Sequence, residues 1–340
     1  MSDAASRISP TIDLDAPGKR QGHLHVPWSR DRSAWGAVRP PITVLRGGQG
    51  PHLLLLAGNH GDEYEGIIAL LKLAETLGAE NLAGAVTILP SLNHPAVLAG
   101  SRASPIDQGN MNRVFPGRRV GTVTEMIADF VLRELVARAD VVVDLHAGGK
   151  SLDFVPSVVL HDLPVPDHMQ RTMEAARAFG APLTLLLDEL DMEGMLDLHV
   201  ERLGKLFLST ELGGGGGTTP ERVAIAERGL QNLLVHFGLV PGRLDLPRPS
   251  RLMAAPNAGF VVSDTAGILE PLVPLGAEVR SGTPLARIHA IEDTGVPART
   301  FTAPMDGLLY ARHHPGLIGR GDCLAVLGRD ATRPGHDPDG

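Results

Sequence analysis

The amino-acid sequence predicts an α/β protein, with a mostly parallel sheet covered by helices on both faces and a small all-β domain after it. Apolar runs of strand length alternate with amphipathic segments of helix length over the first two thirds of the chain. The apolar runs are nearly continuous, which is typical of parallel strands buried on both faces. Beyond a proline-rich segment, only short apolar stretches and many glycines follow. These three observations define the fold class.

Each predicted element follows from its local pattern. Short apolar runs that end in turn residues predict strands, and apolar residues at helical spacing predict helices. The strands are expected over 42–46, 52–58, 85–90, 140–146, 152–160, 183–187 and 205–212, and the helices over 64–78, 122–139, 166–179, 194–203 and 219–238. The segment 91–121 has no periodicity and is expected to be irregular. Long irregular segments in compact domains are often functional.

Changes in composition predict the first domain boundary. Residues 1–40 are polar and are expected to form a loose N-terminal arm, which Trp28 and Trp35 pin to the surface. Residues 41–240 contain the alternating strands and helices. We expect this range to be the domain that carries the chemistry.

A second boundary follows the last predicted helix. The segment "LVPGRLDLPRPS" (239–250) is interpreted as a linker, because proline recurs in it. Residues 251–330 are expected to form a small β-barrel or sandwich. Two similar runs, 275–288 and 315–327, are interpreted as its two halves.

The composition limits the classes of function. The 340 residues carry a formal net charge of −8 without a basic stripe, which argues against nucleic acid and anionic membranes as partners. Cys323 is the only cysteine, so an intrachain disulfide and a cysteine-based zinc site are excluded. No apolar run reaches the ~18–20 residues of a membrane span, and the N-terminus lacks the apolar core of a secretory signal. We expect a cytoplasmic protein and, by default, a homo-oligomer.

Metal-ligating side chains follow the ends of two predicted strands. His60 and Glu63 come directly after the run 52–58, and His146 ends the run 140–146. In open parallel sheets, ligands bind beyond the carboxyl ends of the strands. Two histidines and one glutamate with an open fourth position are a ligand set of hydrolytic zinc. We expect one Zn2+ per subunit on these three residues; a loop histidine bonded to backbone is the alternative for His60.

Two further carboxylates lie near strand ends. Asp144 precedes His146 by two residues, so both side chains point to the same face of the strand. Asp144 is expected to accept the second ring N–H of that histidine. Glu211 is expected to be the general base that takes a proton from water. The alternatives are a capping carboxylate for Asp144 and an acid without chemistry for Glu211.

The run "GNMNRVFPG" (109–117) holds candidate substrate-binding residues. Arginine binds a carboxylate through two parallel hydrogen bonds, and an asparagine amide can bind it from the side. Arg113 and Asn112 are therefore expected to bind a substrate carboxylate. Arg102 is expected to be a second clamp or to polarise the scissile carbonyl, and a solvated loop arginine is the alternative. The glycines 213–217 leave backbone free for a substrate or a hinge, and they do not match a nucleotide-binding G-x-G-x-x-G motif.

Four motifs together resemble the succinylglutamate desuccinylase/aspartoacylase family, relatives of the zinc carboxypeptidases. In chain order they are "GNHGDEYEG" (58–66), "NMNRVFPG" (110–117), "DLHAGG" (144–149) and "TELGGGG" (210–216). The resemblance covers roughly residues 40–330. It implies a zinc-carboxypeptidase-like fold with a mixed, mostly parallel sheet. It also implies a C-terminal all-β domain that narrows the mouth of the site.

The resemblance implies roles for individual residues. Those roles are zinc binding by His60, Glu63 and His146, carboxylate binding by Asn112 and Arg113, and catalytic base for Glu211. The spacing before "NMNR" is longer than in aspartoacylases, which affects the match of Arg102. Asn257 and Tyr310 are the candidates for the residue that the C-terminal domain contributes to the site.

The implied activity is zinc-dependent hydrolysis of a linear amide, removing an acyl group, expected to be acetyl, from a small N-acyl amino acid. The segments 11–36 and 148–156 resemble a bacterial subgroup that deacetylates N-alpha-acetyl-L-2,4-diaminobutyrate in ectoine degradation. The ammonium of such a substrate requires a carboxylate, for which Asp188, Glu189 and Asp191 are candidates. The alternatives are deacylation of another N-acyl amino acid, a small-peptide metallocarboxypeptidase, and a non-catalytic metal- or ligand-binding protein.

Overall fold

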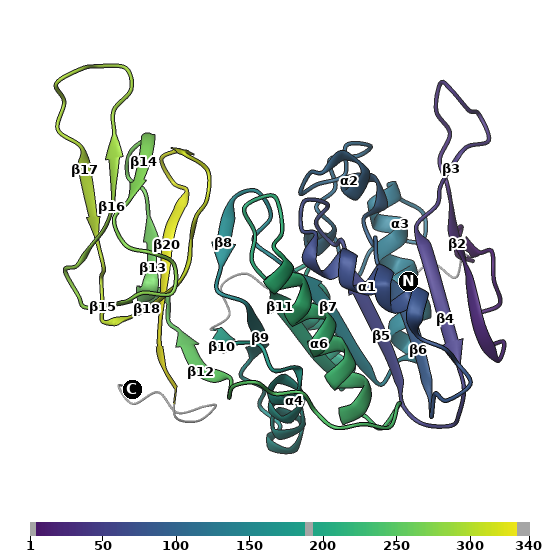
Figure 1. Ribbon diagram of the computed structural model, residues 1–340. Helices are drawn as coiled ribbons and strands as arrows, with labels where there is room; N and C mark the ends of the chain where they lie inside the picture. The colour runs from purple at the N-terminus through teal and green to yellow at the C-terminus, as the bar shows by residue number, and fades with distance from the viewer. Residues whose placement is uncertain (1–4, 188–192, 332–340) are drawn as a thin grey trace.

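A large mixed sheet with helices on both faces forms the first part of the protein, and antiparallel strands form the second (Figure 1). The structure is a computed structural model that describes residues 5–187 and 193–331. It confirms the predicted mostly parallel sheet flanked by helices, followed by strands alone. None of the helices within the described residues has the length and apolar character that crossing a membrane requires.

The sheet of the first part contains two parallel blocks. The first block is, in spatial order, β6 (Ala85–Leu89), β5 (His52–Ala57), β7 (Val141–His146) and β11 (Leu206–Glu211). The second is β9 (Ser157–His161), β10 (Leu183–Leu187) and β12 (Arg251–Ala255). β11 and β9 pair antiparallel, which joins the blocks. The carboxyl ends of β5, β7 and β11 therefore meet at one edge.

Helices cover both faces of this sheet because alternate strand residues point to opposite sides. On one face, α1 (Glu65–Thr76), α4 (Pro166–Phe179) and α6 (Pro220–His236) pack on residues such as Leu53 and Leu55. On the other face, α3 (Val123–Phe130), its π-helical continuation (Val131–Leu135) and α5 (Leu196–Arg202) pack on Leu54 and Leu56. The second face carries the polar residues at the strand ends.

The C-terminal strands surround their own apolar core at one side of the molecule in Figure 1, where they form a separate four-stranded sheet and an extension of the large sheet beyond β12. One sheet has the order β17 (Arg299–Thr302), β16 (Pro284–His289), β14 (Gly267–Pro271) and β19 (Leu317–Ile318). In the other, β20 (Cys323–Asp330) pairs with β12, β13 (Phe260–Val262) and β18 (Gly307–His313), and β18 also pairs with β15 (Glu278–Val279) and β8 (Leu152–Phe154). The pairing of β18 with β8 brings these strands against the first part.

The two similar C-terminal runs adopt the same sequence of elements. Each run has a short strand, a turn and a long strand: β15 and β16 in the first, β19 and β20 in the second. The long strands β16 and β20 lie in different sheets. The short strand β15 of the first run pairs in the sheet that contains β20, and the short strand β19 of the second run pairs in the sheet that contains β16. This exchange is what two halves of one barrel-like unit require.

The N-terminal segment differs from the expected loose arm. β2 (Gly18–Pro27) pairs with β4 (Pro41–Arg46), and β1 (Ser9–Pro10) and β3 (Ala37–Val38) pair with β2, so the segment extends the sheet. Leu24 and Val26 alternate with polar residues and are buried. Trp28 packs against the core, but Trp35 is 96% exposed and pins nothing. The alternation and Trp28 therefore hold this segment, and the expected role of Trp35 is wrong.

Two predicted element boundaries are also corrected. The segment 91–121 contains α2 (His94–Ala99), which ends at Gly100 in the left-handed conformation. A helix of this length is too short to show periodicity in the sequence. The helix expected over 122–139 begins with a capping box at Thr122, but it is α-helical only to Phe130 and then continues as π and 3-10 turns.

Replacing Gly229 with alanine should destabilise the fold. A Cβ there would lie 2.4–2.5 Å from three ring atoms of Phe179, where α6 crosses the end of α4. Alanine gains about 0.5–1 kcal/mol of helix propensity, but overpacking costs about 1–3 kcal/mol. We expect a net loss of about 1 kcal/mol in the free energy of unfolding, measured by urea titration. Phe179→Leu removes the ring and leaves space for the added methyl group, so Gly229→Ala should destabilise the protein less in that background. An equal loss in both backgrounds would show that the contact with Phe179 is not its cause.

Candidate metal centre and cavity

Strand register places four polar side chains on one face of the sheet edge. In β7, Asp144 and His146 are two residues apart and therefore share a face. In the neighbouring β11, Ser209 and Glu211 pair in register with Asp144 and His146, respectively. Since register partners on adjacent strands point to the same side, all four side chains meet beyond the carboxyl ends of these strands.

Two glycines bring the loop after β5 over this edge. Gly58 ends the strand with φ +71, a backbone conformation that side chains disfavour. Gly66 lies in the first turn of α1, where a Cβ would be 2.4 Å from Cβ of Leu145. α1 can therefore begin directly against β7. That close approach places His60 and Glu63 next to His146.

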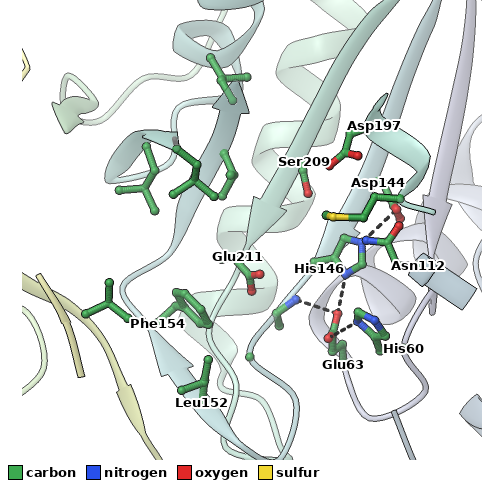
Figure 2. A pocket seen from close by; sticks show the side chains of 18 of the residues that line it. His60, Glu63, Asn112, Asp144, His146, Leu152, Phe154, Asp197, Ser209 and Glu211 are labelled. Atoms are coloured by element: carbon green, nitrogen blue, oxygen red, sulfur yellow. Dashed lines mark hydrogen bonds and ion pairs between the residues drawn. The ribbon is translucent and has the colours of Figure 1, made fainter. Parts of the chain in front are cut away.

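His60, Glu63 and His146 form a buried cluster (Figure 2). His60 Nδ1 lies 2.7 Å from Glu63 Oε1, and His146 Nδ1 lies 2.9 Å from Glu63 Oε2. The three residues are 3%, 4% and 7% exposed. Within 5–187 and 193–331, they are the one group of three histidines, cysteines or acids whose ligand atoms lie within 4.8 Å of one another.

The far ring nitrogens of both histidines are held by other residues. His146 Nε2 donates to Asp144 Oδ2 at 2.9 Å, and Asn59 Nδ2 donates to the same oxygen at 2.9 Å. His60 Nε2 lies 3.2 Å from Asn110 Oδ1. With these protons placed on Nε2, the Nδ1 lone pairs converge with the Glu63 carboxylate. Such a set of acceptors needs a proton or a cation between its members, so the cluster fits a metal ion.

The electrostatics of the cluster follow from its composition. Burial acts to raise the pKa of Glu63, but the adjacent imidazoles hold it well below its ordinary value. Burial acts to lower the pKa of His146, but Asp144 and Glu63 together raise it well above its ordinary value. Glu63 also accepts a hydrogen bond from Ala147 N at 3.1 Å. The site therefore stabilises one carboxylate charge together with positive charge beside it.

Glu211 and Arg102 flank the cluster. Among the described residues, Glu211 Oε2 is buried without a hydrogen-bond partner. Burial, and next the charge of Glu63, raise the pKa of Glu211 to about 8. Arg102 Nη1 lies 3.4 Å from His60 Nδ1 and 3.6 Å from Glu63 Oε1, with half of its side chain exposed. A proton-transferring carboxyl and a guanidinium thus lie beside the cluster.

The cluster opens into a cavity of about 390 Å³, within the range of small-molecule sites. Arg102, Asn112 and Arg113 line it, as do Glu211 and Tyr310. The sequence candidates for the metal, the substrate carboxylate and the base therefore border one space.

Three strands of the C-terminal part, β13, β18 and β20, complete the cavity. Tyr310, on β18, is buried and lines the wall, together with Phe260 and Val326. Asn257, the other candidate, is exposed in a turn and does not line it. Asp188, Glu189 and Asp191 lie outside the described residues, so their expected contact with a substrate ammonium has no structural account.

The glycines after Glu211 were expected to leave room for a substrate or a hinge, but they contact another segment of the chain. A Cβ at Gly214 would lie 2.1 Å from the carbonyl oxygen of Leu152, and Gly213 O accepts from the backbone N–H of Gly148 and Phe154. These glycines allow the chain's own segment 148–154 to approach closely, which builds a wall of the cavity.

A second polar group in the cavity escaped the sequence analysis. His161, Asp197 and Glu201 all line the cavity, on the β9 end and on α5. The sequence offers one weak signal, because Asp197 and Glu201 are four residues apart and share a helix face. Only the tertiary structure brings α5 beside Asn112, through the hydrogen bond from Leu196 N to Asn112 Oδ1.

The raised pKa of Glu211 predicts a pH-dependent stability of the metal-free protein. The unfolded carboxyl ionises near its ordinary 4.5, whereas the folded one keeps its proton to about 8. The protonated carboxyl therefore contributes to the free energy of unfolding. This stabilisation is fully present below pH 4.5 and is lost as the pH rises toward about 8. Glu211→Gln removes this pH dependence. The melting temperature of the variant minus that of wild type should therefore increase by at least ~2 °C between about pH 5.5 and pH 8.5.

Differential scanning fluorimetry in chelator measures that difference. Glu193→Gln, at an exposed acid outside the cavity, is the matched control and should show no such trend. A difference between Glu211→Gln and wild type that stays constant over this pH range, or that the control variant reproduces, would contradict a raised pKa of Glu211.

The chain matches known proteins over nearly its whole length. Residues 49–237 match the family model described as the succinylglutamate desuccinylase/aspartoacylase catalytic domain. A relative from Halomonas elongata, N-alpha-acetyl-L-2,4-diaminobutyric acid deacetylase, is 49% identical over 324 residues, covering 95% of each chain.

Solved structures give the same grouping. The product-bound ectoine utilization protein EutE (DoeB) from Ruegeria pomeroyi has a TM-score of 0.94 and 47% identity, covering 96% of this chain and 99% of that one. A succinylglutamate desuccinylase from Silicibacter sp. TM1040 has a TM-score of 0.94 and 46% identity, covering 96% of this chain and 100% of that one. The chain belongs to the succinylglutamate desuccinylase/aspartoacylase family, as its four motifs predicted.

Proposed function

We propose that this chain is a zinc-dependent deacetylase that hydrolyses N-alpha-acetyl-L-2,4-diaminobutyrate to L-2,4-diaminobutyrate and acetate. The observation that carries the proposal is the buried His60–Glu63–His146 cluster in one cavity with Glu211 and Arg113. Two relatives support it: the Halomonas elongata protein is named for this substrate, and the Ruegeria pomeroyi structure is named for ectoine utilization.

His60, Glu63 and His146 would hold the zinc. Two imidazole nitrogens and one carboxylate are a ligand set of hydrolytic zinc sites. The chemistry that zinc supplies when bound is polarisation of the acyl carbonyl and a water whose pKa falls toward ~7. Asp144 would keep the ring of His146 oriented through its 2.9 Å hydrogen bond.

The remaining residues would bind the substrate and move protons. Arg113 would pair with the amino-acid carboxylate, and Asn112 would donate to it, because Asn112 Oδ1 already accepts from Leu196 N and leaves its NH₂ group for the ligand. The positive charge of a bound zinc would favour the ionised form of Glu211, which would take a proton from the attacking water and give it to the departing amine nitrogen. The guanidinium of Arg102 would stabilise the negative charge that develops on the acyl oxygen.

Other expectations stay predictions from the sequence. They are the division into 1–40, 41–240 and 251–330, the homo-oligomeric state and the cytoplasmic location. Size-exclusion chromatography with light scattering measures the oligomeric state.

A substrate panel tests the proposed function. The zinc-loaded protein should have its highest kcat/KM on N-alpha-acetyl-L-2,4-diaminobutyrate, and a lower one on N-acetyl-L-aspartate, N-succinyl-L-glutamate and a small peptide. A chelator should abolish turnover, and zinc should restore it. Glu211→Gln should keep its zinc and lose about 10²–10⁴-fold in kcat, the usual contribution of a general base.

The same panel separates the alternatives. A preference for acetylaspartate, succinylglutamate or the peptide would support another deacylase or a carboxypeptidase. Zinc-loaded protein without turnover on any of them would support a non-catalytic binding protein. Near-normal turnover by Glu211→Gln with full zinc content would remove this residue from the mechanism.

A further inference from the structure

The cavity has a second acidic group, separate from the metal cluster. Asp197 and Glu201 lie on one face of α5 and face His161 at the end of β9. Glu201 Oε1 is 3.2 Å from His161 Nδ1, and Asp197 Oδ2 is 3.9 Å from His161 Nε2. Asp197 is only 7% exposed. Figure 2 labels Asp197 and Ser209 among the side chains that line the same pocket as Glu63 and His60.

The charges of this group do not balance. Two carboxylates face one imidazole, so among the described residues of this group one negative charge is in excess even when His161 is protonated. Burial raises the pKa of Asp197, because removing a carboxylate from water without a full counter-charge is unfavourable. A cation in the cavity would supply the missing charge.

Asp197 is fixed beside the residue proposed to bind the substrate carboxylate. Leu196 N, at the start of α5, donates to Asn112 Oδ1 at 3.0 Å. This hydrogen bond ties the first turn of α5 to the segment that contains Arg113. The neighbouring residue, Asp197, accordingly projects into the same cavity. In a 2,4-diamino acid, two methylene groups separate the ammonium from the α-carbon, so carboxylate and ammonium subsites must be close together.

We propose that Asp197, with Glu201 and His161 behind it, binds the side-chain ammonium of the substrate and selects diamino acids over neutral and acidic ones. The proposal rests on the proposed deacetylase function for its substrate class. Asp197 Oδ1 accepts from Leu198 N at 2.7 Å, which orients the carboxylate. Its other oxygen, Oδ2, is the one that faces His161 Nε2, and the residue lines the cavity.

A structural role for Asp197 makes a different prediction. An acid in the first turn of a helix is stabilising by itself, and its loss would then weaken binding of every substrate equally. A binding role affects only ligands that carry the ammonium. A pair of ligands that differ at that atom therefore separates the two roles.

The experiment compares L-2,4-diaminobutyrate with L-norvaline, in which a methyl group replaces the ammonium. Isothermal titration calorimetry on the zinc-loaded protein should give about 10- to 100-fold tighter binding of the diamino acid, the usual contribution of a charge-assisted hydrogen bond. Asp197→Asn keeps the acceptor for Leu198 N and should reduce this preference to less than about 3-fold, with norvaline binding unchanged. Glu201→Gln should show a smaller loss, and Glu193→Gln, outside the cavity, none.

Kinetics on the N-alpha-acetyl forms of both amino acids distinguish the two proposals. Loss of the preference in Asp197→Asn, mainly through KM, supports the ammonium site. A wild type that binds the two amino acids equally, or an Asp197→Asn variant that keeps the preference, overturns it. If the preference in binding exists but the acetyl compounds are not hydrolysed, the deacetylase proposal fails while the ammonium site stands.

Discussion

The structure depends on one buried carboxylate held between two imidazoles. Glu63 is 4% exposed, and its two oxygens face His60 and His146 separately. An uncompensated charge at this depth costs several kcal/mol, comparable to the whole net stability of a domain. Packing of the surrounding apolar strands cannot offset that cost locally. The loop 58–64 can therefore occupy its place only when positive charge lies between these three side chains.

The fold satisfies this constraint through close backbone approach. Three parallel strands bring the loop, His146 and Glu211 to one edge, and Gly66 lets α1 begin against Leu145. The hydrogen bonds of Asp144 and Asn110 then leave the Nδ1 atoms of both histidines directed at Glu63. The C-terminal strands add Tyr310 and Phe260 as apolar walls. A dry wall strengthens every charge interaction in the cavity, because fewer waters screen it.

The sequence predicted the strand ends well because those strands are buried on both faces. A continuous apolar run shows where a strand stops, so His60, His146 and Glu211 could be expected at one edge from the sequence alone. The close approach of 148–154 to Gly214 could not be predicted. A glycine run indicates that another group approaches the backbone, but it does not say which group. Asp197 was missed for a related reason. Its importance comes from the docking of α5 beside Asn112, a long-range contact with no local pattern. The sequence pointed instead to acids a few residues earlier, at 188, 189 and 191.

Locating the metal directly tests the central claim. Crystals of the purified protein, measured at the zinc absorption edge, should give one anomalous peak per chain, ~2.0–2.2 Å from the Nδ1 atoms of His60 and His146 and from a Glu63 oxygen. A peak elsewhere, or none in protein shown to contain zinc, with Glu63 still paired directly to both imidazoles, would contradict it.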